Sequence, residues 1–211
     1  MTEGSNAIDH IVFACSDLER GMDEIEQLLG IRPVPGGRHT QFGTHNALLS
    51  LGPATYLEVI ARDPNLPLPE QGNLVDLSGE QESHLITWVL RTEDIVALAS
   101  AAESAGLAIG PVQSGSREQP DGSTLRWQLT DPYAMPMGGA IPFLISWGES
   151  AHPAGVVPRA GELLSLTIEH PDSNSVRESV SVFDVDIAVV QADKFGLVAR
   201  IETGDGVRIL K

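Results

Sequence analysis

The sequence lacks several features that would assign a function directly. Cys15 is the only cysteine, which excludes an internal disulfide and a cysteine-based metal cluster. No apolar run approaches the roughly 20 residues of a membrane helix, and the first residues show no basic segment followed by an apolar one. Only 13 basic residues stand against 29 acidic ones, and the resulting formal charge of −16 repels nucleic acid and anionic lipid. We therefore expect a cytoplasmic protein that binds neither nucleic acid nor membranes.

Common catalytic motifs are missing as well. The chain has no glycine-rich phosphate loop, no nucleophile elbow and no metalloprotease helix motif. Its 211 residues are 42% hydrophobic, which is enough for one large or two small domains with a packed core. The chemistry therefore has to be sought in individual polar residues within predicted strands.

The same order of predicted elements occurs twice along the chain. The first copy begins with a strand over residues 8–14 and a helix that is capped by Ser16-Asp17 and ends at Gly30. A hairpin of two strands follows, with its turn at Gly52-Pro53. About 77 residues later, a strand over 85–91 and a helix that begins at Thr92-Glu93-Asp94 start the second copy. We therefore predict two β-α-β-β-β units and, after another linker, a shorter third unit.

The composition predicts where these units begin and end. We place the divisions as follows: a first module over 7–62, a linker over 63–83, a second module over 84–148, a linker over 149–161, and a truncated third unit over 162–211.

Glu58 is the strongest signal for a site. Alternation along strand 55–61 places Tyr56, Glu58 and Ile60 on one face, so that Glu58 is a carboxylate between apolar neighbours. A buried carboxylate needs a cation, a metal or good hydrogen bonds, because desolvating it alone is very costly. Glu58 therefore belongs either to a functional pocket or to a structural ion pair.

Polar residues lead into the same hairpin. His39, Thr44, His45 and Asn46 are expected at the mouth of a pocket, as substrate-binding residues. Either histidine could complete a set of two histidines and one carboxylate with Glu58, or it could be solvated. Alternation places His45 and Asn46 on opposite faces, so only one of these two can point inward.

Three further residues have both a functional and a structural interpretation. His10, in an apolar strand, is either a core histidine or a metal ligand or acid/base residue. Arg117 precedes a Pro120-Asp121-Gly122 turn and would either recognise a carboxylate or phosphate at a pocket rim or form a salt bridge. Trp127, on the strand after the turn, would line the cavity or pack in the core.

Together these features resemble a known family. Tandem β-α-β-β-β units with His10 in the first strand and Glu58 in the fourth look like the vicinal oxygen chelate superfamily. More closely, residues 7 to about 175 resemble the glyoxalase-like domain family within it. The runs that carry this resemblance are Gly37-Arg38-His39, Gly43-Thr44-His45-Asn46, Tyr56-Leu57-Glu58, Arg117 with Pro120-Asp121-Gly122, and Pro142-Phe143-Leu144-Ile145-Ser146-Trp147-Gly148.

The resemblance implies a fold and a site. The fold would be α+β, with tandem βαβββ modules forming a curved mixed sheet around a cavity and a shorter third β-α-β unit at the C-terminus. His10 and Glu58 would be catalytic and would occupy two positions that hold a divalent metal in the superfamily, such as Zn, Ni, Mn or Fe. In the second module, Thr87 or a neighbour one residue away would lie opposite His10, and Ile145 or Ser146 opposite Glu58. None of these is a normal ligand for such a metal, so we expect an incomplete four-ligand site.

The sequence leaves more than one function open. We predict a glyoxalase-like protein that binds a small oxygenated metabolite. As an enzyme it would be a metal-dependent lyase, isomerase or dioxygenase, or would use Glu58 as a base without metal. The alternative is a degenerate, non-catalytic binding protein of the same fold. The third unit would pack on the edge of the main sheet or mediate a homodimer.

Overall fold

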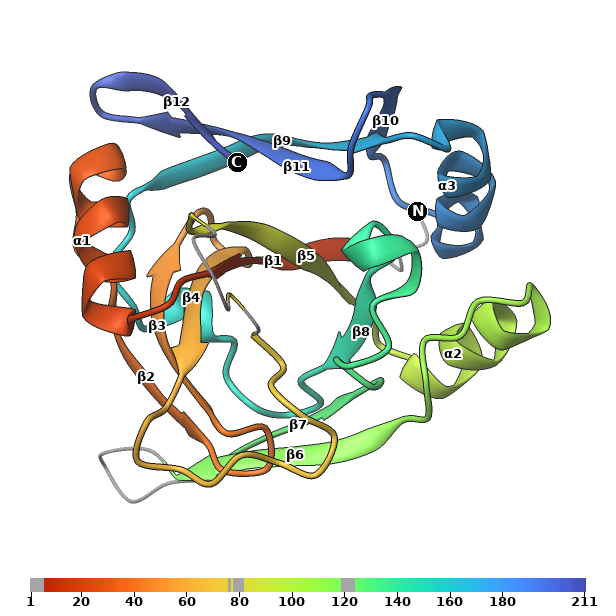
Figure 1. Ribbon diagram of the computed structural model, residues 1–211, viewed down its shortest axis with the longest axis horizontal. Coiled ribbons are helices and arrows are strands. Elements are labelled where there is room, and N and C mark those ends of the chain that lie inside the picture. The colour runs from red at the N-terminus through yellow and green to blue at the C-terminus, as the bar shows by residue number, and fades with distance from the viewer. Residues whose placement is uncertain (1–5, 76, 78–81, 119–123) are drawn as a thin grey trace.

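The computed structural model describes residues 6–75, 77, 82–118 and 124–211, with the side chains of 117 and 118 left out (Figure 1). The Pro120-Asp121-Gly122 turn and the first five residues lie outside this description. The elements of the two large units are β1 (Ala7–Ala14), α1 (Leu18–Leu29), β2 (Val34–His39), β3 (Thr44–Ser50), β4 (Tyr56–Arg62), β5 (His84–Arg91), α2 (Ile95–Ser104), β6 (Gln113–Glu118), β7 (Thr124–Leu129) and β8 (Phe143–Ser146). The last unit comprises β9 (Gly161–His170), α3 (Ser173–Val180), β10 (Ala188–Gln191), β11 (Gly196–Thr203) and β12 (Gly206–Leu210).

The predicted α+β fold is confirmed. Eight strands form one curled sheet in the order β2-β3-β4-β1-β5-β8-β7-β6. Each module thus has the same strand order, read outward from its first strand, and the two modules meet where β1 and β5 pair antiparallel. The two copies are therefore related by an approximate two-fold axis between β1 and β5.

The third unit has the same order of elements as the modules but a different topology. Its four strands are arranged β10-β9-β11-β12, so that its first strand lies between its second and third. It forms a separate sheet that lies over β1 and β5 in Figure 1. Side chains of this sheet, such as Ile168 and Leu197, share one hydrophobic core with Trp88 and Ile11 of the large sheet. The third unit therefore covers the outer face of the curled sheet, whereas the sequence led us to expect it at the sheet edge.

Local sequence explains the helix that covers the other end of this face. The Asp17 carboxylate accepts a hydrogen bond from the backbone N–H of Arg20, and Gly30 adopts a left-handed conformation at the C-terminal end (φ 80°). The buried stripe of α1 packs into the same core.

Cys15 is buried beneath this helix, and burial, with the nearby Glu24 and Asp17, raises the pKa of its thiol to about 12. Cys15 is thus protonated at neutral pH and unsuited to be a nucleophile.

The inner face of the sheet carries a second, smaller apolar cluster. Val12, Ile60, Val89 and Ile145 belong to it, and Val75, from the segment after β4, packs against them. Part of the predicted linker thus lies on the concave side of the sheet. The division into modules and linkers stays a prediction.

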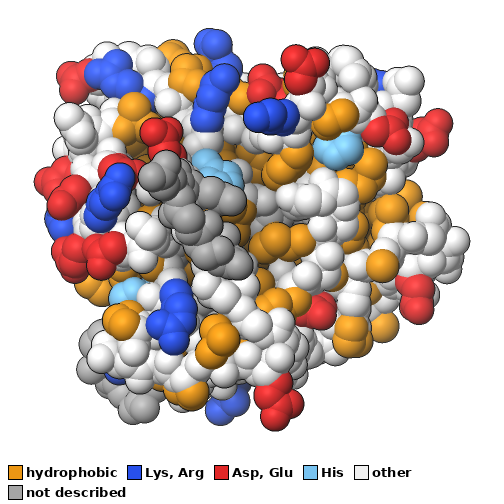
Figure 2. Space-filling view, in the orientation of Figure 1, with side chains coloured by type: hydrophobic (Ala, Val, Ile, Leu, Met, Phe, Trp, Pro, Cys, Tyr) orange, Lys and Arg blue, Asp and Glu red, His pale blue; other side chains and the backbone are white. Residues whose placement is uncertain are grey.

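Charged side chains lie on the outer surface (Figure 2). On the α1 side, Arg32 forms ion pairs with Glu19, Asp23 and Glu26. Within the described residues, no helix has the length and hydrophobicity that crossing a membrane requires.

Candidate functional site

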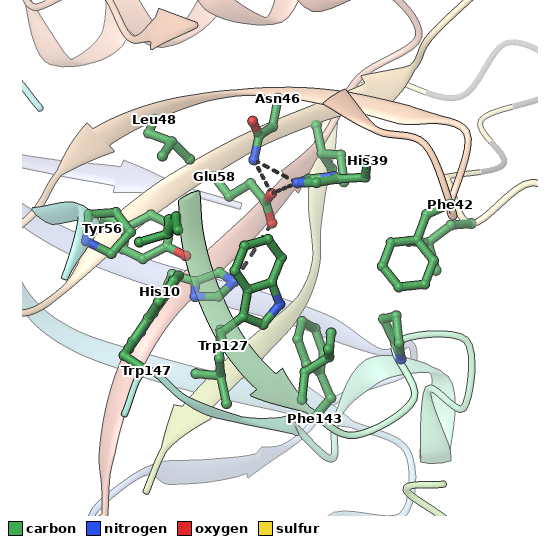
Figure 3. Close-up of a pocket in the computed structure, with 17 residues that line it drawn as sticks. His10, His39, Phe42, Asn46, Leu48, Tyr56, Glu58, Trp127, Phe143 and Trp147 are labelled. Carbon is green, nitrogen blue, oxygen red and sulfur yellow. Dashed lines mark hydrogen bonds and ion pairs between the residues drawn. The ribbon is translucent and has the colours of Figure 1, made fainter. Parts of the chain in front are cut away.

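A pocket opens on the concave face of the curled sheet (Figure 3). Its empty volume is about 630 Å³, a figure that includes space open to solvent. The first module and the segment that follows it contribute His10, His39, Phe42, Asn46, Leu48, Tyr56, Glu58, Ile60 and Leu74 to its lining. The second module and the segment after it contribute Leu125, Trp127, Leu129, Pro132, Phe143, Ile145, Trp147 and Pro153. The polar groups of the described lining thus come almost entirely from the first module.

His10 is buried and held at both ends of its ring. Its Nδ1 lies 2.7 Å from Oδ1 of Asp9, and its Nε2 lies 3.7 Å from Oε2 of Glu58. The ring stacks on Tyr56, with centroids 4.4 Å apart and an angle of 18° between the planes. Because an ionised Asp9 can only accept, Nδ1 of His10 is the donor, and Nε2 is directed toward Glu58 and the pocket.

Glu58 reaches the same pocket from β4 and is 8% exposed. Its Oε1 accepts a hydrogen bond of 2.5 Å from the Asn46 side-chain amide. Oε2 faces His10. The described lining contains no lysine or arginine that could pair with Glu58. Hydrogen bonding by Asn46 therefore provides part of the compensation that this carboxylate requires.

The structure separates the polar residues of the hairpin. Nε2 of His39 lies 4.0 Å from Oε1 of Glu58, and its Nδ1 lies 3.0 Å from the Thr44 hydroxyl. Thr44 is buried behind His39 and does not line the pocket. His45 is outside the lining too, because alternation along β3 directs Asn46 inward and His45 to the other face.

Asp9 supports this site, although sequence analysis did not single it out. It is fully buried and lies at a β-bulge, since Ile8 pairs with Leu90 and His10 with Val89. β-Bulges change the direction in which a side chain points, and they are frequent next to functional sites. Burial would raise the pKa of Asp9, but hydrogen bonds from His10 and His152 hold it well below its ordinary value. His152, which the sequence placed in a linker, donates to Asp9 across 2.9 Å.

The positions of the second module that correspond to His10 and Glu58 carry no ionisable group. Val12 pairs with Glu58 in the first module, and Val89, 77 positions later, pairs with Phe143 in the second. The counterpart of Glu58 is thus Phe143, and not Ile145 or Ser146 as the sequence alignment suggested. The counterpart of His10 is Thr87, as expected, and its hydroxyl donates to the Gly139 carbonyl.

These residues do not fit a four-ligand metal site. Phe143 has no donor atom, and the Thr87 hydroxyl is engaged with the backbone. Among the side chains that the structure describes, no three of His, Cys, Asp or Glu are grouped as ligands of one ion. Of the predicted metal ligands, His10 and Glu58 do face each other, but they supply two donors where three or four are usual.

The two remaining predicted residues lie in the second module. Trp127 lines the pocket and contacts Trp147, with ring centroids 5.8 Å apart. The backbone of Arg117 pairs with Leu125 in β6 and β7, and its side chain is outside the described part. The site therefore unites His10, His39, Asn46, Glu58 and Trp127.

Comparisons with known proteins agree with this architecture. A hypothetical protein from Staphylococcus aureus superposes with a TM-score of 0.63 at 18% identity, over 97% of this chain and 84% of that chain. A methylmalonyl-CoA epimerase variant from Streptomyces coelicolor matches with a TM-score of 0.47 at 19% identity, over 70% of this chain and 100% of that one. The epimerase from Mycobacterium tuberculosis matches with 0.44 at 20% identity, over 66% and 86%. No curated protein matches the sequence.

At 18% identity, the Staphylococcus aureus structure bears on the fold alone. The family model of the glyoxalase-like domain, by contrast, matches residues 8–182, which is most of the chain. The chain therefore belongs to the glyoxalase-like domain family.

Proposed function

We propose that the pocket binds a small, uncharged, largely apolar molecule with a carbonyl oxygen. We propose further that His10 and Glu58 remove a proton from this molecule and return it. The apolar walls favour a flat hydrocarbon or aromatic body, because Trp127, Trp147 and Phe143 offer large ring surfaces. The Glu58 carboxylate would repel an anionic ligand, and the described lining offers no cation to compensate. This supports a neutral ligand over a carboxylate or phosphate.

One observation carries the proposal of proton transfer. Nε2 of His10 and Oε2 of Glu58 face each other across 3.7 Å, while Nδ1 of His10 is engaged by Asp9. Two acceptors in this arrangement repel each other unless a proton lies on one of them. The pair can therefore hold one proton, give it to a ligand and take it back.

This chemistry suits isomerisation next to a carbonyl group. The deprotonated member of the pair removes a proton from the carbon beside the carbonyl, which leaves an enolate. Return of the proton to the opposite face of the same carbon gives the epimer, and return to the same face gives back the starting compound, so atoms and charge balance in both cases. Proton transfer by a positioned side chain accelerates such a reaction by roughly 10²–10⁴-fold.

Because no three of His, Cys, Asp or Glu are grouped as ligands of one ion among the described side chains, the proposed steps do not use a divalent metal. Zinc, nickel, manganese or iron bound by His10 and Glu58 would polarise the carbonyl oxygen, and would need ligand or water at every other position. Homodimerisation and a cytoplasmic location stay predictions.

The test uses matched ligands and a carbon–hydrogen exchange assay. Phenylacetone and phenylacetate share an aromatic body and differ in charge. We expect phenylacetone to raise the melting temperature and phenylacetate to leave it unchanged. In D₂O, the protein should also accelerate deuterium incorporation beside the carbonyl of phenylacetone, as measured by NMR.

Variants connect this activity with the proposed pair. Glu58→Gln keeps an oxygen for Asn46 but removes the charge, and we expect a loss of exchange of roughly 10²–10⁴-fold with binding retained. His45→Gln, on the opposite face of the same hairpin, is the matched control and should keep full exchange. Equal exchange in wild type and Glu58→Gln would contradict the proposal of proton transfer.

The absence of ionisable side chains from the described second-module wall favours a second candidate, a binding protein without catalysis. The same assay separates the two. Stabilisation by phenylacetone without any exchange above buffer would indicate binding alone. No response to any neutral carbonyl compound would remove both candidates.

A further inference from the structure

The strongest unassigned feature is the group of donors around Asp9. This fully buried carboxylate receives His10 Nδ1 at 2.7 Å on Oδ1, and Trp147 Nε1 at 3.0 Å and His152 Nε2 at 2.9 Å on Oδ2. Nη1 of Arg91 lies 3.6 Å from Oδ2. These partners come from β1, β5 and the segment after β8. Three separate parts of the chain thus converge on one side chain beside the pocket.

The hydrogen bonds around Asp9 have a definite direction. The backbone N–H of Ala154 donates to Nδ1 of His152 at 3.2 Å, so this nitrogen carries no proton. The proton of neutral His152 is therefore on Nε2, which must donate to Asp9. Trp147 can only donate. Oδ2 is thus committed to two donors, Trp147 and His152, and Oδ1 is left for His10.

We infer that Asp9 is a positioning residue that keeps a proton on Nδ1 of His10 and leaves Nε2 as the nitrogen that serves the pocket. The chain of contacts runs from Ala154 through His152 and Asp9 to His10 and ends at Glu58. Its use in catalysis rests on the proposed function. The position of the proton on His10 does not, because it follows from the hydrogen bonds alone.

The substitution Asp9→Asn gives a sharp test. Because Trp147 and His152 both donate at the Oδ2 position, the amide oxygen of the variant should lie there. Its NH₂ group would then point at Nδ1 of His10, which must accept. The proton of His10 should therefore move to Nε2, as an aspartate-to-asparagine change does to the histidine of serine proteases.

Nitrogen NMR of the imidazole rings reads this change directly. The chain has 6 histidines, and the His10 signals are identified by their loss in His10→Gln. In wild type we expect Nδ1 of His10 and Nε2 of His152 to be protonated. In Asp9→Asn we expect His10 to be protonated on Nε2 instead. An unprotonated Nδ1 of His10 in wild type would overturn the inference, even if the variant did not fold.

Asp172→Asn is the matched control. Asp172 also lies beside a histidine, since its backbone N–H donates to Nδ1 of His170, but it caps α3 on the surface. Asparagine caps helices as well as aspartate does, so this variant should fold normally. Its His10 signals should equal those of wild type. An Asp9→Asn protein with unchanged His10 signals would also overturn the inference.

The exchange assay then separates the two proposals. If the proton moves to Nε2 and exchange falls by roughly 10²–10⁴-fold with phenylacetone binding retained, both are supported. In another outcome the proton moves, but wild type shows no exchange, or Asp9→Asn exchanges as fast as wild type. The inference about Asp9 then stands and the proposed proton transfer is wrong.

Discussion

The two halves of the curled sheet share a backbone but not a chemistry. Each has the same strand order, and each bulges at the same place, at Asp9 in β1 and at Ile86, 77 positions later, in β5. The following residue is His10 in one half and Thr87 in the other, and Glu58 corresponds to Phe143. The first half supplies hydrogen-bonding and ionisable groups, and the second supplies an apolar wall.

This difference shows how a repeated fold can specialise. Backbone pairing and the outer core maintain the symmetry, while the pocket face is free to diverge. An apolar wall opposite His10 and Glu58 excludes water and strengthens their electrostatic interaction. The described lining from the second half thus contributes to the site without an ionisable group of its own.

The largest expected effect comes from exchanging the two bulge residues for alanine. Asp9→Ala leaves His10, Trp147 and His152 without their acceptor, and breaking a buried charged network of this kind costs about 3–5 kcal/mol of unfolding free energy. Ile86→Ala, at the corresponding position, removes partly exposed apolar surface and should cost about 2 kcal/mol, the low end for such changes. Urea unfolding at pH 7 measures both. Equal losses of unfolding free energy in Asp9→Ala and Ile86→Ala would contradict the difference between the two halves of the sheet.

The effect of Asp9 should also depend on pH in a definite direction. The pKa of Asp9 is lowered in the folded protein, so its stabilising contribution is complete above the pKa of the unfolded chain, near 4. Below that pH the unfolded chain takes up a proton that the folded protein does not bind. The difference between wild type and Asp9→Ala should therefore be constant from pH 6 to 8 and shrink progressively below pH 4. A difference that grows on acidification would have the wrong sign.

A second way to break the comparison is to make the halves alike. The double variant Thr87→His, Phe143→Glu places donors at the positions that correspond to His10 and Glu58. We expect zinc or nickel at 100 times its dissociation constant to stabilise this variant by about 2.7 kcal/mol, measured by urea unfolding. Thr87→Ser, Phe143→Leu changes the same positions without adding donors and should gain nothing. Stoichiometric metal binding by wild type would show that two donors suffice.

The smallest expected effect sharpens the role of the apolar wall. Trp127→Ala removes a ring from the pocket and should weaken binding of phenylacetone by roughly tenfold, or about 1.4 kcal/mol, through lost apolar contact. Gln128→Ala, the next residue on β7, is exposed and lies outside this pocket, so affinity should not change. Titration calorimetry measures both. Equal affinities of the two variants would remove Trp127 from the site.

Much of the fold could be predicted because its signals are local. Helix caps such as Asp17 and Asp94, glycine at helix ends, and alternation along strands each depend on a few neighbouring residues. Alternation also predicted that only one of His45 and Asn46 points inward. It could not predict which, because that depends on which face of β3 lies over the core.

The register of β8 shows where such reasoning stops. Counting from the helix caps located the counterpart of His10 to within one residue of Thr87, but it placed Ile145 or Ser146 opposite Glu58. A long segment joins β7 to β8, so counting residues from the helix cap does not give the register of β8. Pairing with β5 sets the position of β8 instead. Phe143 could therefore be recognised as the counterpart of Glu58 only in three dimensions.

The sequence by itself determined the succession of strands and helices, the repetition of the module and the presence of a mid-strand carboxylate at position 58, since each follows from local periodicity and composition. Only the tertiary structure decided that Asp9 and His152, 143 positions apart, meet behind His10. The reason is physical: a buried charge selects its partners by distance in space, and a bulge in β1, invisible in the sequence pattern, brings them within hydrogen-bonding range.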